Sequence, residues 1–217
     1  MELYEDQLKK CLDGEFENDF WLALNNTIVH FKLTPKHFFD LLSAFKQDVI
    51  KSRYKTYDEV IDYCKRSANP VGKIILELFG IREDELFTYS DAICTALQLT
   101  NFYQDIEIDY CKNRIYLPTE EMEKFGVELN QFELKQNNTN FEKLQKYQVE
   151  RTRKLFEEGK KLLGKLPLNL KLQIKMTILG GENILDKIEK INYNVFNRRP
   201  ILSKIDYAII FLKGLVS

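Results

Sequence analysis

The stretch LQLTNFYQDIEIDYCKNRIYLP, residues 97–118, holds the pattern on which the interpretation of this chain depends. Within it, Asn101, Asp105 and Asp109 recur every four residues. Residues at i, i+4 and i+8 share one face of an α-helix, so the three oxygen-bearing side chains are predicted to stack in a row. Neighbouring carboxylates at this spacing repel one another, so the row needs a physical reason to exist.

The composition indicates one globular domain without a nucleic-acid function. A chain of 217 residues that is 44% hydrophobic can bury one substantial core, so we expect a single domain over residues 1–217. Lys and Arg total 32 against 33 for Asp and Glu, so the chain lacks the broad positive field that phosphate contacts require. We therefore expect no nucleic acid among its partners.

Cysteine usage and the first residues both favour the cytoplasm. The four cysteines are scattered without CxxC pairing, and there are only two histidines, so no zinc spacing is present. The cysteines are interpreted as reduced, mostly buried thiols. The opening MELYEDQLKK has neither the basic nor the apolar region of a secretory signal.

The pattern of apolar residues predicts an all-α fold. Glycine and proline are sparse, at 9 and 5, and apolar residues recur mostly at three- and four-residue spacing. The start and stop signals predict helices at about residues 34–53, 56–80, 84–111 and 141–163. The second of these should kink at residues 67–72, where Pro70 lacks a backbone donor and Gly72 lacks a side chain.

The last apolar run, YAIIFLKGLV at residues 207–216, is too short to cross a bilayer. A transmembrane helix needs ~20 apolar residues, and this run also contains Lys213. The run is interpreted as a closing helix packed on the core. The alternative is an interfacial anchor that brings the protein into peripheral contact with the inner face of the membrane.

A row of oxygen side chains suits a hard cation. Mg²⁺ prefers oxygen ligands and commonly binds through one or two carboxylates plus substrate phosphates. Lys112 and Arg114 follow directly, where they can reach phosphate oxygens that the metal does not neutralise. The alternative, a solvated helical face, is disfavoured because the rest of the helix is apolar at Ile93, Ala96, Leu97, Leu99, Phe102, Ile106 and Ile108. The predicted ligands of Mg²⁺ are Asn101, Asp105 and Asp109.

Three stretches of the chain resemble the squalene and phytoene synthase family of trans-isoprenyl diphosphate synthases. QLTNFYQDIEIDYCKNRIYLP is similar to that family's second aspartate-rich motif with its basic loop, and YCKRSANPVGKIILELFG to the kinked helix that lines its prenyl tunnel. GGENILDKIEKINYNVFNRRPILS is similar to its C-terminal portion. The resemblance implies an isoprenoid-synthase-type helical bundle around a central apolar tunnel, with magnesium at one mouth.

The resemblance also implies roles for individual residues. Asn101, Asp105 and Asp109 match the metal and diphosphate positions, and the catalytic residues implied are Asp105, Asp109 and Arg114. The substrate-binding residues implied are Tyr63, Ala68, Val71, Gly72, Gln98, Gln104, Lys112 and Tyr116. Ordinary core packing is the alternative role for the first four, because tunnel walls and cores use the same residue types.

The combination of SANPVG and NFxQD is most similar to the hydroxysqualene synthase branch of the family, which serves bacterial hopanoid biosynthesis. Condensing members usually carry Arg at the position of Gln104. The implied reaction is the magnesium-dependent conversion of presqualene diphosphate to hydroxysqualene with loss of diphosphate. The alternatives are head-to-head condensation of two farnesyl or geranylgeranyl diphosphates and a non-catalytic subunit that binds prenyl diphosphate. Presqualene diphosphate synthase and a flavin-dependent reductase are the implied pathway partners.

One motif of the family is absent from the sequence. The first aspartate-rich motif should lie upstream of the segment that matches MELYEDQLKKCL. We expect a chain that begins late and lacks the opening helices. Three explanations for the missing motif are open: a start codon placed too far downstream, a fragment or split gene, and a protein that has lost catalysis. Such a chain should leave apolar faces of the bundle exposed.

Overall fold

The computed structural model describes residues 2–215 and is all-α, as the sequence predicts. Apart from one isolated β-bridge between Arg53 and Ile115, the regular structure of these residues is helical. The helices are α1 (Glu2–Leu12), α2 (Asp19–Phe31), α3 (Pro35–Ile50), α4 (Tyr57–Ser67), α5 (Asn69–Leu78), α6 (Asp84–Gln104), α7 (Ile106–Cys111), α8 (Thr119–Phe125), α9 (Leu129–Glu133), α10 (Thr139–Lys160), the 3₁₀ turn Lys161–Lys165, α11 (Leu168–Lys190) and α12 (Lys204–Leu215).

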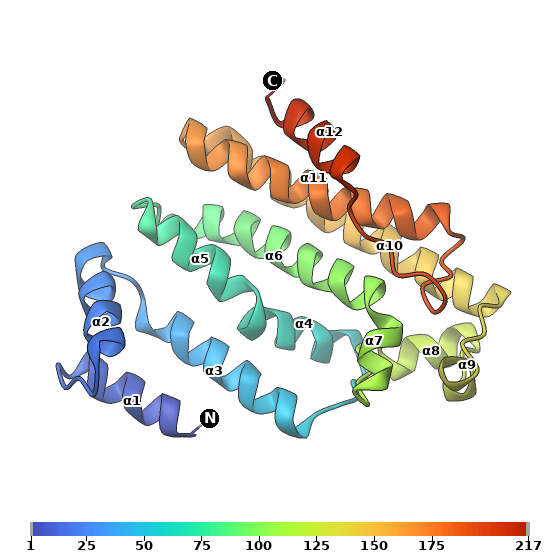
Figure 1. The fold of residues 1–217 in the computed structure, drawn as a ribbon, viewed down its shortest axis with the longest axis horizontal. Coiled ribbons are helices and arrows are strands. Elements are labelled where there is room, and N and C mark those ends of the chain that lie inside the picture. Colours follow the sequence, from blue (N-terminus) through green and yellow to red (C-terminus); the bar gives the residue numbers. More distant parts are fainter. Residues whose placement is uncertain (1, 216–217) are drawn as a thin grey trace.

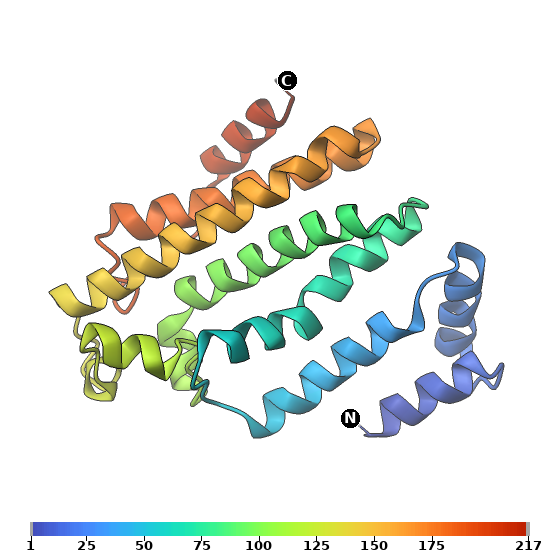
Figure 2. The ribbon, with the colours of Figure 1, turned by 180° about the vertical axis from the view of Figure 1, so that it is seen from behind.

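Helix α6 lies at the centre of the arrangement (Figure 1). It packs against α4 and α5 on one side and against α10 and α11 on the other. Helix α3 covers α4 and α5, and the α1–α2 pair lies beyond it at one edge of the molecule. At the opposite edge α12 packs on α11, and Figure 2 shows α10 running alongside α11 on the far face.

The core has two parts. The main hydrophobic cluster joins buried side chains from α3 through α11 and includes Leu76, Leu99, Phe156 and Leu185. A small separate cluster of Leu8, Cys11 and Trp21, joined by partly buried side chains of α3, lies between the first three helices. The central helices are therefore fixed by the larger core.

The break between α4 and α5 lies where the sequence predicts a kink. Ala68 separates the two helices, with φ −123° and ψ −48°. Gly72, four residues later, allows α5 to approach α6 closely: a Cβ at this position would lie 2.4 Å from Ser90 Oγ and 2.6 Å from Cys94 Sγ. Gly72 therefore has a packing role here, which is the alternative that the sequence left open.

The sequence predicts one helix at residues 84–111, but the structure has two, α6 and α7. The prediction is wrong at Asp105, where the helix is interrupted. Asp105 leaves the helical conformation, with φ −105° and ψ 18°, and separates α6 from α7. Its N–H still donates to Asn101 O at 2.9 Å, and the Asp109 N–H donates to Asp105 O at 2.8 Å. Because these i→i+4 hydrogen bonds persist, the three residues of the predicted row keep the backbone spacing of a helix across the break.

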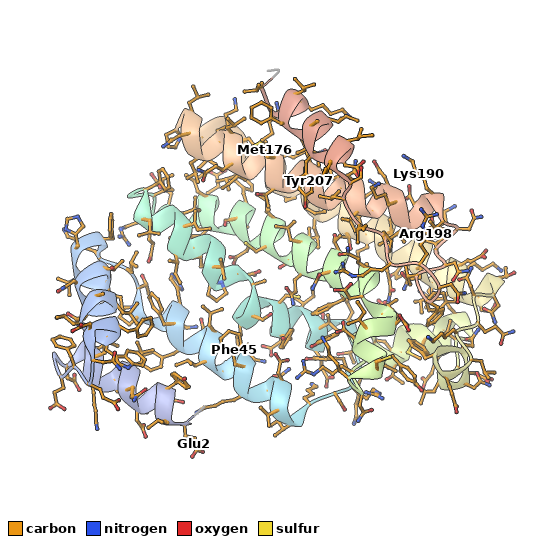
Figure 3. The ribbon with its side chains drawn as sticks, viewed as in Figure 1. Glu2, Phe45, Met176, Lys190, Arg198 and Tyr207 are labelled. Atoms are coloured by element: carbon orange, nitrogen blue, oxygen red, sulfur yellow. The ribbon has the colours of Figure 1, made fainter. Side chains whose placement is uncertain are left out.

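Helix α12 packs on α11 as a closing helix but exposes much of its apolar surface. Ile210 and Gly214 are buried, whereas Ile205 is 72% exposed and Leu212 is 62% exposed. Helix α3 likewise exposes Phe45, which Figure 3 labels. These surfaces agree with the expectation of exposed apolar faces. The predicted apolar run ends at residue 216, which lies outside the described residues.

The cysteines and the helix lengths complete the comparison with the sequence predictions. All four cysteines are free thiols; Cys11 and Cys64 are buried, Cys94 is half-buried and Cys111 is exposed, so the predicted burial holds fully for two of them. Within residues 2–215, no helix is both long enough and apolar enough to span a membrane.

Candidate functional site

A hollow of about 680 Å³ lies between α6, α11 and α12. Two of the predicted site residues, Asn101 and Gln104, form part of its α6 wall. Met176 and Tyr207 face it from α11 and α12 and are labelled in Figure 3. The remaining wall is largely apolar: Leu97, Gly180, Gly181, Ile184, Leu202, Ile210 and Phe211. The oxygen row thus begins at the wall of a largely apolar hollow with a few polar groups, the kind of cavity that binds small molecules.

The carboxylate of Asp105 is paired with an arginine that the sequence reasoning did not select. Arg199, in the segment between α11 and α12, donates from Nη2 to Asp105 Oδ2 at 3.1 Å and from Nε to Oδ1. This two-point contact raises the pKa of Arg199. The sequence NRRP at residues 197–200 could have indicated a basic group near the site. It could not indicate the pairing with Asp105, because the two residues lie 94 positions apart in the sequence.

A second, basic hollow of about 250 Å³ adjoins the first. Gln104 lines the larger hollow, and its amide donates to the carbonyl of Pro200, which lines the smaller one. The basic residues of this second hollow are Lys187, Lys190, Arg198 and Arg199. Among the described residues, Lys190 and Arg198, labelled in Figure 3, have no ion-pair partner, so their charges remain available to an anion.

Asp109 is half-buried and lines a small cavity together with Arg114 and Tyr116. Burial, followed by the negative charge of Asp105, raises the pKa of the Asp109 carboxyl to about 6. Lys112 and Arg114 act in the opposite direction without cancelling the effect. The neighbouring carboxylates therefore repel each other in the protein as they do in the sequence argument, and a cation between them would relieve that repulsion.

The basic loop after α7 is fixed to the end of α3. Arg114 donates from Nη2 to the Asp48 carbonyl at 2.8 Å, and the Ile115 N–H donates to Ser52 O at 3.0 Å. Arg53 also bonds the carbonyl and side chain of Asn113. Arg114 is half-buried and lines the same small cavity as Asp109, whereas Lys112 is exposed.

Tyr63 and Tyr116 belong to a cluster of four aromatic rings rather than to the wall of the large hollow. Tyr116 stacks on Phe102 with ring centroids 3.8 Å apart, and Tyr63 and Tyr54 complete the cluster. Burial raises the pKa of Tyr116 and that of Tyr63. A cavity of about 10 Å³, no larger than one water, separates the rings from Asp109 and Arg114.

The other predicted substrate-binding residues lie apart from the large hollow. Val71 is 45% exposed on α5, and Ala68 is half-buried at the break between α4 and α5. Gln98 is half-buried one turn before Asn101. None of the three lines the hollow between α6, α11 and α12. Their proposed contact with substrate therefore stays a prediction.

The donor set of the row fits magnesium only together with further oxygens. Residues 2–215 contain no group of three His, Cys, Asp or Glu side chains arranged to hold a metal ion. Asn101, Asp105 and Asp109 supply one amide and two carboxylate groups, which are the hard donors that Mg²⁺ accepts alongside waters and phosphate oxygens. The two carboxylates are close enough for Asp105 to raise the pKa of Asp109. The residues present therefore fit the metal as a partial site that substrate would complete.

The fold and this site place the chain in the class of all-helical isoprenoid-synthase folds. Comparison with known proteins then gives the family: the sequence profile of squalene/phytoene synthase matches residues 1–206. The chain belongs to the squalene/phytoene synthase family.

Solved structures and curated relatives agree with this assignment. The crystal structure of squalene synthase HpnC from Alicyclobacillus acidocaldarius is 37% identical, with a TM-score of 0.86 over 89% of this chain and 73% of that chain. A dehydrosqualene synthase in complex with ligand is 25% identical, with a TM-score of 0.89 over 97% of this chain and 75% of that chain. Hydroxysqualene synthase from Rhodopseudomonas palustris is 32% identical over 179 residues, which are 82% of this chain and 60% of the relative.

Phytoene synthases are also among the relatives, and the chain covers only part of their length. The 15-cis-phytoene synthase from Synechocystis sp. is 30% identical over 208 residues, which cover 90% of this chain and 62% of the relative. Against the enzymes from Narcissus pseudonarcissus and Solanum lycopersicum, the chain spans 50% and 55% of their length. The chain thus spans about half to three fifths of these relatives.

Proposed function

We propose that this chain supplies the diphosphate-binding site of a magnesium-dependent enzyme of isoprenoid biosynthesis. The reaction proposed is conversion of presqualene diphosphate and water to hydroxysqualene and diphosphate. The similarity of the chain to squalene synthase HpnC and to hydroxysqualene synthase supports this reaction. Gln104, where condensing members usually carry Arg, favours this reaction over condensation of two prenyl diphosphates.

The observation that carries the proposal is the adjacency of three surfaces. The apolar hollow of about 680 Å³ is of a size to hold a long hydrocarbon chain. Asn101 and Gln104 lie at its wall, Asp105 follows on the same row, and the basic hollow with Lys190 and Arg198 adjoins it. A prenyl diphosphate has this same order of parts, an apolar chain ending in a polyanion.

In this reaction the carbon–oxygen bond of the ester breaks and diphosphate leaves with the electron pair. Magnesium held by Asn101, Asp105 and Asp109 would offset the negative charge of the diphosphate. Lys112, Arg114, Arg198 and Lys190 would supply further positive charge to the leaving group. The rings of Phe102 and Tyr63 lie beside Asp109 and Arg114 rather than in the wall of the large hollow, so they would stabilise the carbocation at the diphosphate end of the substrate until water adds to it and a proton is lost.

The test is product analysis with each candidate substrate. Purified protein is incubated with presqualene diphosphate or with farnesyl diphosphate, with and without Mg²⁺, and the lipids are separated and identified. Hydroxysqualene formed from presqualene diphosphate supports the proposal. Turnover of farnesyl diphosphate but not of presqualene diphosphate would instead assign the alternative reaction, head-to-head condensation of two prenyl diphosphates.

A second candidate function is binding without turnover. It is favoured by the described residues 2–215, which contain no group of three His, Cys, Asp or Glu side chains arranged to hold a metal ion by themselves. Isothermal titration with a non-hydrolysable farnesyl diphosphate analogue separates the two functions. Magnesium-dependent binding without product from either substrate would assign a prenyl-diphosphate-binding subunit. Asp105→Asn should weaken that binding, whereas Glu107→Gln, which changes an acid of the exposed Glu107–Lys135 pair, should not.

A further inference from the structure

We propose that Asp48, in the last turn of α3, is a positioning residue of this site. It fixes the orientation and the hydrogen-bonding polarity of the Tyr63 phenol, and its carbonyl fixes the place of the Arg114 guanidinium. The inference rests on the proposed function, since it concerns the same site. No sequence motif marks Asp48, and only the packing of α3 against α4 brings it to Tyr63.

The first contact involves the phenol. The Tyr63 hydroxyl donates to Asp48 Oδ2 at 3.0 Å. A phenol has one proton to donate, so this bond leaves the Tyr63 oxygen only its lone pairs for other groups. Tyr116 is the neighbouring ring in the aromatic cluster, with its centroid 5.7 Å from that of Tyr63. Toward a ligand, Tyr63 therefore acts as an acceptor whose ring is held in one orientation.

The second contact involves the backbone. Asp48 lies within the last four residues of α3, whose carbonyls have no intrahelical partner and carry the negative end of the helix dipole. The Arg114 guanidinium donates to this carbonyl at 2.8 Å. Bonds between Ser52 and Ile115 and between Arg53 and Asn113 hold the same two segments together. Arg114 is thus positioned by the main chain of α3, and this contact does not need the Asp48 side chain.

The side chain and the main chain of Asp48 make different contacts, so their roles can be tested separately. The carboxylate bonds Tyr63, and the carbonyl bonds Arg114. Removing the Asp48 carboxylate breaks the bond to Tyr63 and leaves the backbone bonds from Arg114 and Ile115 in place. The second carboxylate oxygen, Oδ1, is buried and accepts no hydrogen bond from any described residue. This oxygen remains available as an acceptor for a group bound beside the row, in keeping with a place in the site rather than in the scaffold.

The test combines fluorine NMR with a double-mutant cycle. The protein is labelled with 3-fluorotyrosine, and Tyr63→Phe identifies the Tyr63 resonance. Asp48→Ala should shift that resonance, while those of Tyr147 and Tyr207, which lie on α10 and α12, stay in place. Asp58→Ala, which removes an exposed acid from the same helix as Tyr63, is the matched control and should leave the Tyr63 resonance unchanged.

The kinetic arm asks whether Asp48 acts through Tyr63. Asp48→Ala and Tyr63→Phe should each lower kcat with presqualene diphosphate by about tenfold, the effect of one lost hydrogen bond to a charged group. The double variant should be no slower than the slower single variant, because both changes remove the same contact. Asp48→Asn, which keeps an oxygen acceptor, should restore much of kcat and provides a folded variant if the alanine variant does not fold.

The outcomes are distinct. An unmoved Tyr63 resonance in both Asp48 variants, or additive losses of kcat, would overturn the positioning role. If the unaltered protein turns over neither substrate, the proposed function fails. The fluorine experiment then still decides whether Asp48 holds Tyr63.

Discussion

Replacing Asp109 by Asn should stabilise the metal-free protein at neutral pH. The carboxyl is half-buried beside Asp105, and its pKa in the folded protein is about 6 against an ordinary value of 3.8. The folded state therefore binds the proton more tightly than the unfolded state. It follows that the stability contributed by this group is complete below about pH 4 and is lost as the pH rises through 6.

The magnitude follows from the same pKa values. For a fully buried group, raising the pKa from 3.8 to about 6 corresponds to roughly 3 kcal/mol. Asp109 is only half-buried, and solvent screens the repulsion from Asp105, so we expect about 1–2 kcal/mol. In a chain of this length, that gain corresponds to a rise in Tm of about 3–6 °C.

The assay is thermal unfolding followed by circular dichroism at several pH values, in the presence of a chelator. Asp109→Asn should exceed the unaltered protein in Tm at pH 7, and the difference should vanish near pH 4. Glu107→Gln changes an acid of the same helix that forms an exposed ion pair with Lys135, and it should shift Tm little at any pH. Added Mg²⁺ should raise the Tm of the unaltered protein and leave Asp109→Asn unmoved.

Two results would refute this reasoning. Asp109→Asn could prove less stable than the unaltered protein at pH 7, which would mean that the carboxylate is stabilised by partners. The stability difference could also be independent of pH, which would mean that Asp109 titrates normally. Either result would remove the electrostatic argument for a cation at the row.

Three further predictions test other parts of the structure. Glu77, 2% exposed, accepts hydrogen bonds from the N–H and hydroxyl of Thr34 at the start of α3, so Glu77→Gln should cost about 1–3 kcal/mol of unfolding free energy in urea denaturation. Gly72→Ala should cost about 1–3 kcal/mol in the same assay, because the new Cβ meets Ser90 Oγ at 2.4 Å. Thr177→Trp should fill part of the large hollow and weaken binding of a farnesyl diphosphate analogue about tenfold without changing binding of inorganic diphosphate.

For each of these three predictions, a specific result would contradict the reasoning. Unchanged stability of Glu77→Gln would show that the buried network tolerates a neutral amide. For Gly72→Ala, the double variant with Ser90→Ala should recover part of the loss, and no recovery would contradict the proposed clash. Equal weakening of both ligands by Thr177→Trp would mean that the hollow does not hold the hydrocarbon chain.

The helical class and the oxygen row could be predicted from the sequence because both depend on local spacing. Apolar residues at three- and four-residue intervals bury one face of a helix wherever that helix packs. The backbone hydrogen bonds that join Asn101 to Asp105 and Asp105 to Asp109 persist across the break at Asp105, because bonds at this spacing are local. The kink near Pro70 was predictable for the same reason.

The partners of the row could not be predicted, because they come from distant parts of the chain. Arg199 reaches Asp105 from 94 residues away, and Asp48 reaches Tyr63 from another helix. Pairings of this kind depend on how helices pack, and single-sequence spacing carries no record of it. Gly72 and Val71 show the same limit: one packs against α6 and the other is exposed, although adjacent residues of one motif suggested a shared tunnel wall.

The sequence by itself determined that the chain is helical and where its acids, amides and basic loop lie along those helices. Only the tertiary structure decided that the row begins at the wall of an apolar hollow and that a basic hollow adjoins it. It also decided which cation pairs with Asp105. The physical reason is range: hydrogen bonds within a helix join residues four apart, whereas burial and charge pairing join whichever residues the packed helices bring together.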